Sequence, residues 1–397
     1  MLSAKSAPIV RATLPAVGGA LDDITPLFYK KMFTARPELL RDLFNRGNQA
    51  GGEQPKALAA SIASFATLLL ERPDERPDAM LARIAGKHAS LGVTSDQYTI
   101  VHEHLFAAIA DVLGEAVTPE VAAAWDEVYW LMAGALIAAE ARLYREAGVP
   151  DGDVWRELEI AGRREETPDT ASFLLRSPDG APLPPFLPGQ YVSVQVELPD
   201  GAHQIRQYSL SCAPGRHEWR ITVKRVRDLA GAPEGEVSTW LHEHARPGDR
   251  LRVSLPFGDL ALPEGDGPLL LASAGIGATP MLAILDHLAG AGSDRRVLAV
   301  HADRSPADHA HRDELHALVA ALPNATLHLW YEEPGASGAT AGLADLGALE
   351  LPEGLTAYLC GPLPFMRELR GDLLERGVAA RDVHYEVFGP DLWLGRD

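Results

Sequence analysis

The spacing of hydrophobic residues changes twice along this chain, and these two changes constrain its fold more than any other feature. Over residues 1–148 apolar side chains recur at helical spacing, in segments such as "TPLFYKKMF", "PKALAASIASFATLLLE" and "PEVAAAWDEVYWLMAGALIAAEARLYREAG". "TSDQ" and "TPE" are candidate helix starts, and Gly148 is a candidate stop. This part of the chain predicts an all-α domain of about six to eight helices.

After a turn-rich linker, "GVPDGD" (148–153), the hydrophobic period becomes two. "QYVSVQVEL", "QYSLSCA", "EWRITVKRV" and "RLRVSLP" alternate apolar and polar residues, which is typical of a small antiparallel β-barrel. Further on, apolar strands such as "RRVLAVHADR" and "LTAYLCGP" alternate with helical stretches, as in an α/β parallel sheet. We therefore expect three domains, at residues 1–148, 152–262 and 266–397.

Charge and cysteine content narrow the classes of partner and cofactor. The formal charge is −19, with 55 acidic and 36 basic residues, which argues against a nucleic-acid partner. Cys212 and Cys360 are too few for a disulfide framework or for a four-thiolate iron–sulfur cluster. No apolar run is long enough for a transmembrane span, and the first residues lack a secretory signal, so we expect a cytoplasmic protein.

A glycine turn lies between an apolar strand and a helix in "PLLLASAGIGATPMLAILDHLAG". Gly275 and Gly277 would let the backbone approach a pyrophosphate at the helix N-terminus, and Pro280 suits the first helical turn. Many strand–helix turns carry glycine for steric reasons alone. By itself, this turn is therefore as consistent with a plain connection as with a nucleotide site.

The strand "RQYSLS" (206–211) carries a second candidate site. Arg206 and Tyr208 would share one face of the strand, where they could pair with a phosphate and lie against an aromatic ring. An ordinary barrel strand with a surface arginine and a half-buried tyrosine explains the same residues equally well.

In combination these segments are far more specific. "PGQY" (188–191), "RQYS" (206–209), "GEVSTWLH" (235–242), "GIGATP" (275–280) and "YLCGP" (358–362), in that order, resemble the ferredoxin–NADP reductase superfamily over residues 152–397. The resemblance implies that this half takes a hydride from NADH or NADPH and stores two electrons on FAD. It implies as cofactor-binding residues Tyr191, Arg206, Gln207, Tyr208, Ser209, Glu236, Val237, Ser238, Gly275, Ile276, Gly277, Ala278, Thr279, Pro280, Cys360, Gly361 and Pro362.

The helical part holds a histidine on an apolar face. Leu81, Ile84 and His88 fall on one side of a helix, and taken alone His88 is better explained as a core histidine than as a metal ligand. Glu140 lies on another apolar stripe, where an unpaired carboxylate costs several kcal/mol. A ligating imidazole usually donates its other N–H to an acceptor, and Glu140, held by Tyr98, could be that acceptor. A solvent-facing Glu140 and a plain core Tyr98 remain alternatives.

The whole helical part resembles one family. "FYKKMF", "ELLRDLFN", "NQAGGEQPKAL", "IAGKHASLG", "QYTIVHEHL" and "LIAAEARLY" are similar to the globin domain of flavohaemoglobins, and "HYEVFGP" (384–390) also fits that family. The resemblance implies that His88 holds the iron of haem b. It implies as catalytic residues Tyr29, Gln54, Leu58, Tyr98, Glu140 and Glu386, and as further cofactor-binding residues Phe44, Lys87, Val387, Phe388, Gly389 and Pro390.

The function that this resemblance implies is a monomeric, NAD(P)H-dependent nitric oxide dioxygenase, which converts NO and O₂ to nitrate. One alternative is a flavin-dependent NAD(P)H reductase whose helical domain only docks an electron acceptor. Another is a gas sensor or oxygen store, which would not need the reductase half.

Three features leave details open. Ala278 stands where the family often has Gln, and Val387 where it often has Cys. Pro55 is compatible with a pocket position for Gln54 only if Gln54 lies in the first turn of its helix.

The choice of coenzyme is also open at this stage. In "HADRSP", Arg304 and Ser305 could meet the 2′-phosphate of NADPH, whereas Asp303 would repel it.

Overall fold

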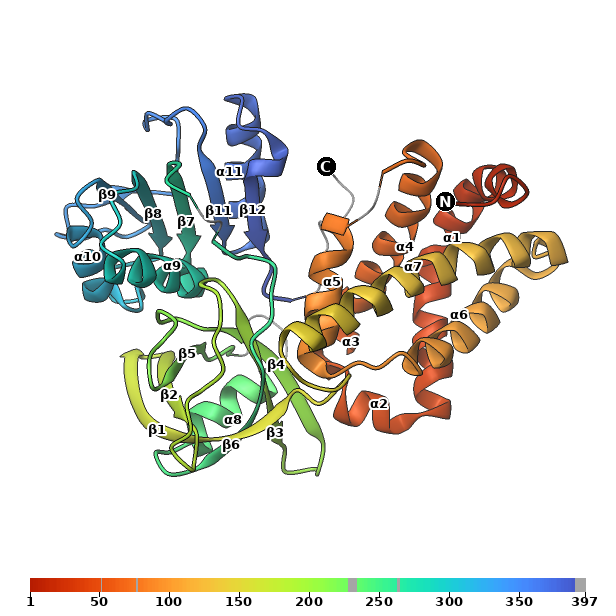
Figure 1. Cartoon of the computed structure of the whole chain (residues 1–397), viewed down its shortest axis with the longest axis horizontal. Coiled ribbons are helices and arrows are strands. Elements are labelled where there is room, and N and C mark those ends of the chain that lie inside the picture. Colours follow the sequence, from red (N-terminus) through yellow and green to blue (C-terminus); the bar gives the residue numbers. More distant parts are fainter. Residues whose placement is uncertain (51, 76–77, 228–233, 263–264, 390–397) are drawn as a thin grey trace. The chain divides into compact units, whose positions relative to one another are not determined.

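The computed structural model describes residues 1–50, 52–75, 78–227, 234–262 and 265–389 (Figure 1). The chain divides into two compact units. The first contains Met1–Trp155, Glu197–Ile205 and Gly389, and the second contains Arg156–Val196 and Arg206–Phe388.

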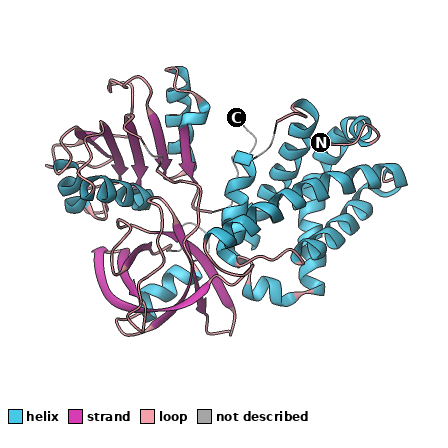
Figure 2. Cartoon of the chain, viewed as in Figure 1, coloured by secondary structure: helices cyan, strands magenta, loops and turns pink. Residues whose placement is uncertain are grey.

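Every secondary-structure element described within the first 148 residues is a helix (Figure 2). The helices described there are α1 (Ser6–Ala35), α2 (Pro37–Asp42), α3 (Arg46–Ala50), α4 (Glu53–Glu71), α5 (Asp78–Leu91), α6 (Gln97–Leu113), the short 3₁₀ helix η1 (Gly114–Ala116) and α7 (Pro119–Glu146). The predicted starts hold: Thr118 accepts a hydrogen bond from the Val121 N–H at 3.3 Å, and Gln97 Oε1 accepts one from the Thr94 N–H at 3.1 Å. Gly148 follows α7 with a φ of 71°, as a helix stop requires.

Helix α1 is much longer than the segment "TPLFYKKMF" indicates. It contains Pro15 and Pro26, and a proline inside a helix removes a backbone hydrogen bond at a cost of about 3 kcal/mol. Burial along one face offsets this cost, since six large side chains recur every three, four or seven residues. They are Val10, Val17, Leu21, Ile24, Phe28 and Met32.

Helix α7 is long and apolar enough to cross a membrane by length and composition alone, which is weak evidence. Its buried residues Ala124, Trp125, Val128, Ala133 and Leu136 pack in the core of the helical part. The expectation that no segment crosses a membrane therefore stays a prediction.

The second predicted domain is an antiparallel sheet in the order β4-β3-β6-β1-β2-β5. Its elements are β1 (Trp155–Thr167), β2 (Thr170–Arg176), β3 (Tyr191–Glu197), β4 (His203–Ser209), β5 (Trp219–Lys224), α8 (Glu236–His244) and β6 (Arg250–Ser254). An isolated bridge joins Leu210, just after β4, to Ile221 of β5, so the two outer strands meet and the sheet closes. This confirms the predicted small barrel.

The tip of the β3–β4 hairpin belongs to the first unit. The amide of Gln204, which is fully buried, donates to the carbonyls of Leu40 and Arg41 in the last turn of α2 and of Phe44 just after it. Its Oε1 accepts from the Arg46 N–H at 3.2 Å. One side chain therefore satisfies backbone groups that the end of a helix leaves without intrahelical partners.

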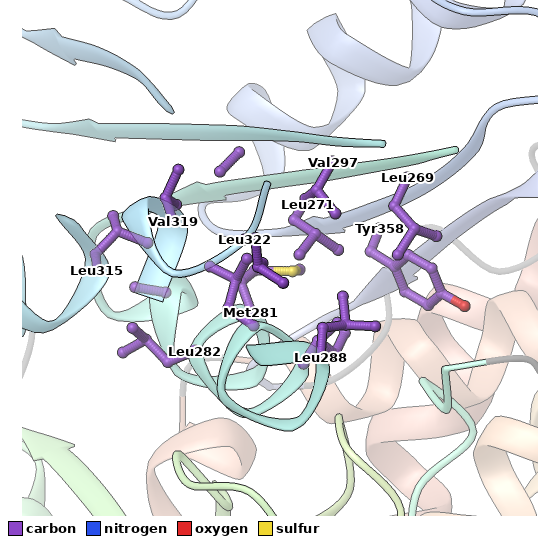
Figure 3. Packing of buried hydrophobic residues seen from close by; sticks show 14 of the residues in the cluster. Leu269, Leu271, Met281, Leu282, Leu288, Val297, Leu315, Val319, Leu322 and Tyr358 are labelled. Carbon is purple, nitrogen blue, oxygen red and sulfur yellow. The ribbon is translucent and has the colours of Figure 1, made fainter. Parts of the chain in front are cut away.

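The last part of the chain is a parallel sheet in the order β10-β9-β8-β7-β11-β12, as predicted. Its elements are β7 (Leu269–Ala274), η2 (Gly275–Gly277), α9 (Ala278–Gly290), β8 (Val297–Asp303), α10 (Arg312–Ala320), β9 (Ala325–Tyr331), β10 (Thr340–Ala341), β11 (Thr356–Cys360), α11 (Leu363–Glu375), η3 (Ala380–Asp382) and β12 (Val383–Glu386). Figure 3 shows part of one hydrophobic core, to which Met281 and Leu282 of α9, Leu315 of α10, and Leu271 and Val297 of the sheet belong. The alternation of strands and helices produces this core because each helix covers the sheet with its apolar face.

A buried polar cluster joins the barrel to the parallel sheet inside the second unit. His311, immediately before α10, has a φ of 60°, which is uncommon for a residue with a side chain. Its Nε2 lies 2.9 Å from Thr222 Oγ1 of β5, and its Nδ1 lies 2.9 Å from Glu314 Oε2. The Arg220 guanidinium donates to both oxygens of Glu314 at 2.8 and 2.7 Å. These bonds fix α10 against the barrel.

Candidate functional site

Three predicted residues of the globin-like part lie together. His88 of α5 places Nδ1 2.8 Å from Glu140 Oε1 of α7, and 3.0 Å from the hydroxyl of Tyr98 of α6. Tyr98 donates to the same carboxylate oxygen at 2.5 Å. Glu140 is 3% exposed, so it does not sit at a solvent-facing edge. The position of Glu140 on an apolar stripe therefore correctly predicts a buried carboxylate.

The proton positions in this cluster follow from the chemistry of its partners. A carboxylate only accepts hydrogen bonds, so His88 Nδ1 carries a proton and donates it to Glu140. Burial, and next the negative charge of Glu140, raises the pKa of Tyr98 far above its ordinary value. Tyr98 therefore remains a phenol and orients the carboxylate.

The other ring nitrogen of His88 suits an iron ligand. The side chain is 33% exposed, and both hydrogen bonds described for the His88 ring involve Nδ1 rather than Nε2. An imidazole with Nδ1–H held by a carboxylate and Nε2 open is the usual arrangement of a metal-ligating histidine. The residues present therefore fit haem ligation by His88, which stays a prediction.

Tyr29 of α1 carries a second buried polar group, and its ring is surrounded by apolar side chains. Burial raises the pKa of its hydroxyl well above the ordinary value, and hydrogen bonds with Gln49 and Gln54 partly oppose that rise. Phe44, whose ring centre is 5.8 Å from that of Tyr29, and Leu58 pack on the same cluster. The structure thus brings together all four residues predicted to line the pocket.

Pro55 does not prevent Gln54 from forming a hydrogen bond with Tyr29. Helix α4 begins at Glu53, so Gln54 is its second residue and Pro55 its third. A proline in the first turn removes an N–H that has no helical partner in any case. The condition set by Pro55 is therefore met.

Gln49 is a pocket residue that sequence reasoning missed. It belongs to the short helix α3, and its Nε2 is buried without a hydrogen-bond partner among the described residues. Only its position in "NQAGGEQ", five residues before Gln54, hinted at a role. That spacing has no helical meaning across Gly52, which has a φ of 71°.

Lys87 and Gly389 also meet within the first unit, where Lys87 Nζ donates to the Gly389 carbonyl at 2.6 Å. Lys87 therefore binds backbone at the end of the predicted "HYEVFGP" segment. Phe388 is 47% exposed, and Pro390 lies outside the described residues.

Burial along the candidate flavin strand β4 follows the predicted faces only in part: Arg206 and Tyr208 are both half-buried, but Gln207 and Ser209, which were predicted to share the other face, differ. Gln207 is exposed, whereas Ser209 is buried and its Oγ has no hydrogen-bond partner among the described residues. Burial raises the pKa of Tyr208, and the nearby charge of Arg206 opposes that shift. Tyr191 lies at the start of β3 and is buried. The orphaned Ser209 hydroxyl fits a polar group of a flavin, which would complete its hydrogen bonds.

Helix α8 begins at Glu236, and its first turn carries the predicted residues. Val237 and Ser238 are buried, while Glu236 is half-buried. The Ser238 hydroxyl donates to the Gly235 carbonyl at 3.0 Å, so it stabilises the turn. No side chain caps the start of α8, and the same holds for α9. Uncapped N–H groups at two helix starts fit the two pyrophosphates of a flavin and a nicotinamide dinucleotide.

The glycine turn and the "CGP" segment lie against each other. A Cβ added at Gly277 would stand 2.2 Å from the Cys360 carbonyl oxygen, so only glycine allows this approach. Gly275 has a φ of 54° and open space beside it. Thr279 donates to the Ile276 carbonyl at 3.0 Å, while Ala278 and Pro280 are buried in α9. Gly361 and Pro362 continue directly into α11.

Cys360 and Glu386 occupy neighbouring positions on β11 and β12, which pair in parallel. Burial, and next the charge of Glu386, raises the pKa of the Cys360 thiol well above its usual value. The thiol therefore stays protonated, and its side chain packs in the hydrophobic core that α9 forms with the sheet. Val387 follows, also buried.

Comparison with known protein families covers all three parts of the chain. Residues 27–136 match the globin family, residues 157–261 match the oxidoreductase FAD-binding domain, and residues 271–371 match the oxidoreductase NAD-binding domain.

Similar proteins extend over nearly the whole chain. The flavohemoprotein of Bordetella pertussis is 42% identical over 407 residues, covering 98% of this chain and 99% of that protein. The crystal structure of a flavohemoglobin from Malassezia yamatoensis, with bound FAD and heme, is 38% identical with a TM-score of 0.90 and covers 98% and 100% of the two chains. The flavohem-like FAD/NAD-binding domain of a nitric oxide dioxygenase from Vibrio cholerae is 36% identical with a TM-score of 0.56, covering 59% of this chain and 99% of that one.

Proposed function

This chain belongs to the flavohaemoprotein family, an oxidoreductase with haem, FAD and a nicotinamide coenzyme, and we propose that its specific activity is that of a nitric oxide dioxygenase. In this reaction NO and O₂ combine to give nitrate, and each NAD(P)H supplies the electrons for two nitrate ions. One relative of the reductase half bears this activity in its name, which supports the proposal.

The observation that carries the proposal is the buried bond between His88 Nδ1 and Glu140. When bound, the haem supplies an iron that takes O₂, and the flavin stores the two electrons of a hydride. A carboxylate that accepts the Nδ1 proton raises the electron density at Nε2. A more basic His88 ring would give more electron density to an iron that it holds, which favours reactions at O₂ over simple storage.

Tyr29 supplies a hydrogen-bond donor in the same domain. Its raised pKa keeps the hydroxyl protonated at any physiological pH. A phenol donor at this position would stabilise the partial negative charge of bound O₂, and Gln49 and Gln54 lie within hydrogen-bonding reach of the hydroxyl. Leu58 and Phe44 exclude water around this donor.

In the second unit, Arg206 would pair with the FAD phosphate and Tyr208 would lie on the flavin ring. The starts of α8 and α9 would bind one pyrophosphate each through their N–H groups. The contact between Gly277 and Cys360 sets how closely the glycine turn approaches the end of β11. These residues position the coenzyme for hydride transfer.

The alternative is a reductase that only passes electrons to a docked protein. The globin match over residues 27–136 favours a haem-based activity instead.

The test is consumption of NO by the haem- and FAD-loaded protein under air, with NADH and then NADPH as donor. We expect NO to disappear with nitrate as product, in a ratio of two nitrate ions per coenzyme oxidised. Rapid reduction of ferricyanide without nitrate formation would favour the alternative.

A further inference from the structure

The end of β8 is the part of the protein that would discriminate between NADH and NADPH. β8 pairs in parallel with β7, with Ala302 beside Ala274, so it ends next to the Gly275–Gly277 turn. In open parallel sheets, the pyrophosphate lies over the glycine turn and the adenosine ribose lies at the end of the adjoining strand. The 2′ position of that ribose, which carries the extra phosphate of NADPH, would therefore face residues 303–308.

The two groups that could bind a 2′-phosphate are already held by one carboxylate. Arg304 Nη2 donates to Asp308 Oδ1 at 2.5 Å, and the Ser305 hydroxyl donates to Asp308 Oδ2 at 2.7 Å. Arg304 also lies 3.9 Å from Asp169 Oδ2 of the barrel. Its side chain is 60% exposed, so the guanidinium is at the surface but paired with acids.

Asp303 is turned into the protein. Its Oδ1 accepts from the Arg304 N–H at 2.8 Å, and its Oδ2 lies 3.6 Å from Nε2 of the buried His301. The Asp303 side chain is only 5% exposed. The repulsion expected from this residue on the basis of the sequence therefore comes mainly from another acid, Asp308.

The charges around this edge disfavour a doubly negative group. Glu332 and Glu333 follow β9, and their N–H groups donate to the carbonyls of Asp303 and Arg304 at 3.2 and 2.8 Å. The Arg304 guanidinium itself lies within 4.0 Å of two carboxylates, those of Asp308 and Asp169. A neutral ribose diol can hydrogen-bond to such acids, whereas like charges brought together reduce binding strongly.

We propose that Asp308 is the residue that makes this protein prefer NADH over NADPH, because its carboxylate occupies both Arg304 and Ser305. The proposal rests on the hydride-transfer step of the proposed function, and it does not depend on what happens to NO.

The test measures kcat/KM for NADH and for NADPH with the full-length holoprotein, and ferricyanide as electron acceptor. We expect wild type to favour NADH by about tenfold or more. Asp308→Asn keeps the size of the side chain but removes its charge and frees Arg304. The variant should shift the preference toward NADPH by about tenfold.

A second substitution separates this role from a structural one. Arg304→Gln in the Asp308→Asn background should reverse the gain with NADPH, since the guanidinium is what binds the phosphate. Asp313→Asn, which neutralises an exposed acid in the first turn of α10, is the matched control and should keep the wild-type ratio. Added salt should narrow the wild-type preference, because the repulsion is electrostatic.

Three results would overturn the proposal: equal use of both coenzymes by wild type, an unchanged ratio in Asp308→Asn, or a gain that persists without Arg304. Ferricyanide takes its electrons from the flavin, so a failure to oxidise NO leaves this measurement intact. The two proposals can therefore fail separately.

Discussion

Tyr29 keeps its proton because burial opposes the formation of a phenolate, and this single effect makes it a donor at every physiological pH. Glu140 is also buried, but it acts as a hydrogen-bond acceptor rather than a donor. Its carboxylate accepts from His88 and Tyr98 and has almost no exposed surface. At the scale of residues, the chemistry of the helical part therefore depends on which buried groups donate and which accept.

Tyr29→Phe removes the donor and keeps the ring. We expect faster O₂ dissociation and a fall of about tenfold or more in NO consumption, as for one lost charge-stabilising hydrogen bond. Stopped-flow measurement of O₂ release checks this. Tyr144→Phe is the control, since that buried hydroxyl donates to the Val93 carbonyl at 2.6 Å. An unchanged O₂ dissociation rate in Tyr29→Phe would refute the assigned role.

His309 gives a pH dependence at the same scale. Burial, and then the positive charges of neighbouring groups, lowers its pKa from 6.5 to about 2. Its Nδ1 lies 2.7 Å from the Tyr331 hydroxyl, and its ring stacks on His301 with centres 3.9 Å apart. Between pH 6.5 and 2, His309 is therefore protonated in the unfolded chain but neutral in the folded chain.

His309 therefore makes the free energy of unfolding depend on pH. Its contribution is complete above pH 6.5 and is lost as the pH falls, by at most about 1.4 kcal/mol per pH unit for one proton. His309→Phe should reduce the loss of the urea midpoint between pH 7.5 and pH 5 relative to wild type. His217→Phe, which replaces an exposed histidine in the loop before β5, should leave that loss as it is. Equal pH slopes for His309→Phe and wild type would contradict the assignment.

At the scale of elements, close approaches between segments decide where the nucleotides can lie. The glycine turn after β7 meets the end of β11 at Gly277 and Cys360, and the starts of α8 and α9 are left without side-chain caps. Gly277 has an ordinary φ of −60°, so its requirement for glycine is purely steric. The glycine turn and the "CGP" segment are far apart in sequence, but they lie in contact and would face the same coenzyme.

Gly277→Ala should push the turn away from β11, because the new Cβ would lie 2.2 Å from a backbone oxygen. A displacement of about 1 Å near a reaction can cost about a hundredfold in rate. We therefore expect slower flavin reduction by NADH in stopped-flow experiments, with haem and flavin contents unchanged. Gly290→Ala, at a position with open space in the same helix, is the control. A wild-type rate of flavin reduction in Gly277→Ala would show that the contact does not position the coenzyme.

At the scale of the whole molecule, the residues that we propose to hold the haem iron and the FAD phosphate belong to different compact units. His88 lies in the first and Arg206 in the second, although the hairpin tip that holds Gln204, two residues before Arg206, belongs to the first. The two cofactors should therefore be lost independently.

His88→Ala should give a yellow protein that retains FAD and reduces ferricyanide but lacks a Soret band and NO consumption. Arg206→Ala should give the reverse, a red protein with weakened FAD retention, because the guanidinium that pairs with a phosphate is gone. Absorbance spectra after gel filtration check both variants. Normal flavin content in Arg206→Ala, or stable haem in His88→Ala, would contradict the roles assigned to these residues.

Much of the fold could be predicted from local patterns. The change from helical spacing to alternation, and then to strands between helices, depends on which face of each element is buried, and that information is present in every short segment. Motif order was equally informative, since "RQYS", "GIGATP" and "CGP" carry their chemistry in adjacent residues. His88 ends an apolar stripe and Glu140 interrupts another, which predicted these two as a pair, whereas Tyr98 was added only as the residue that could hold Glu140.

The remaining features required the tertiary structure, because they join residues with no fixed spacing. Gln49 reaches Tyr29 from a separate short helix, and Gln204 caps α2 from a strand more than 150 residues away. The direction of Asp303 and the pairing of Arg304 with Asp308 were undecided in the sequence, since "HADRSP" supports either coenzyme. Periodicity determines which side chains are buried, but only the packing of elements determines which polar groups then meet.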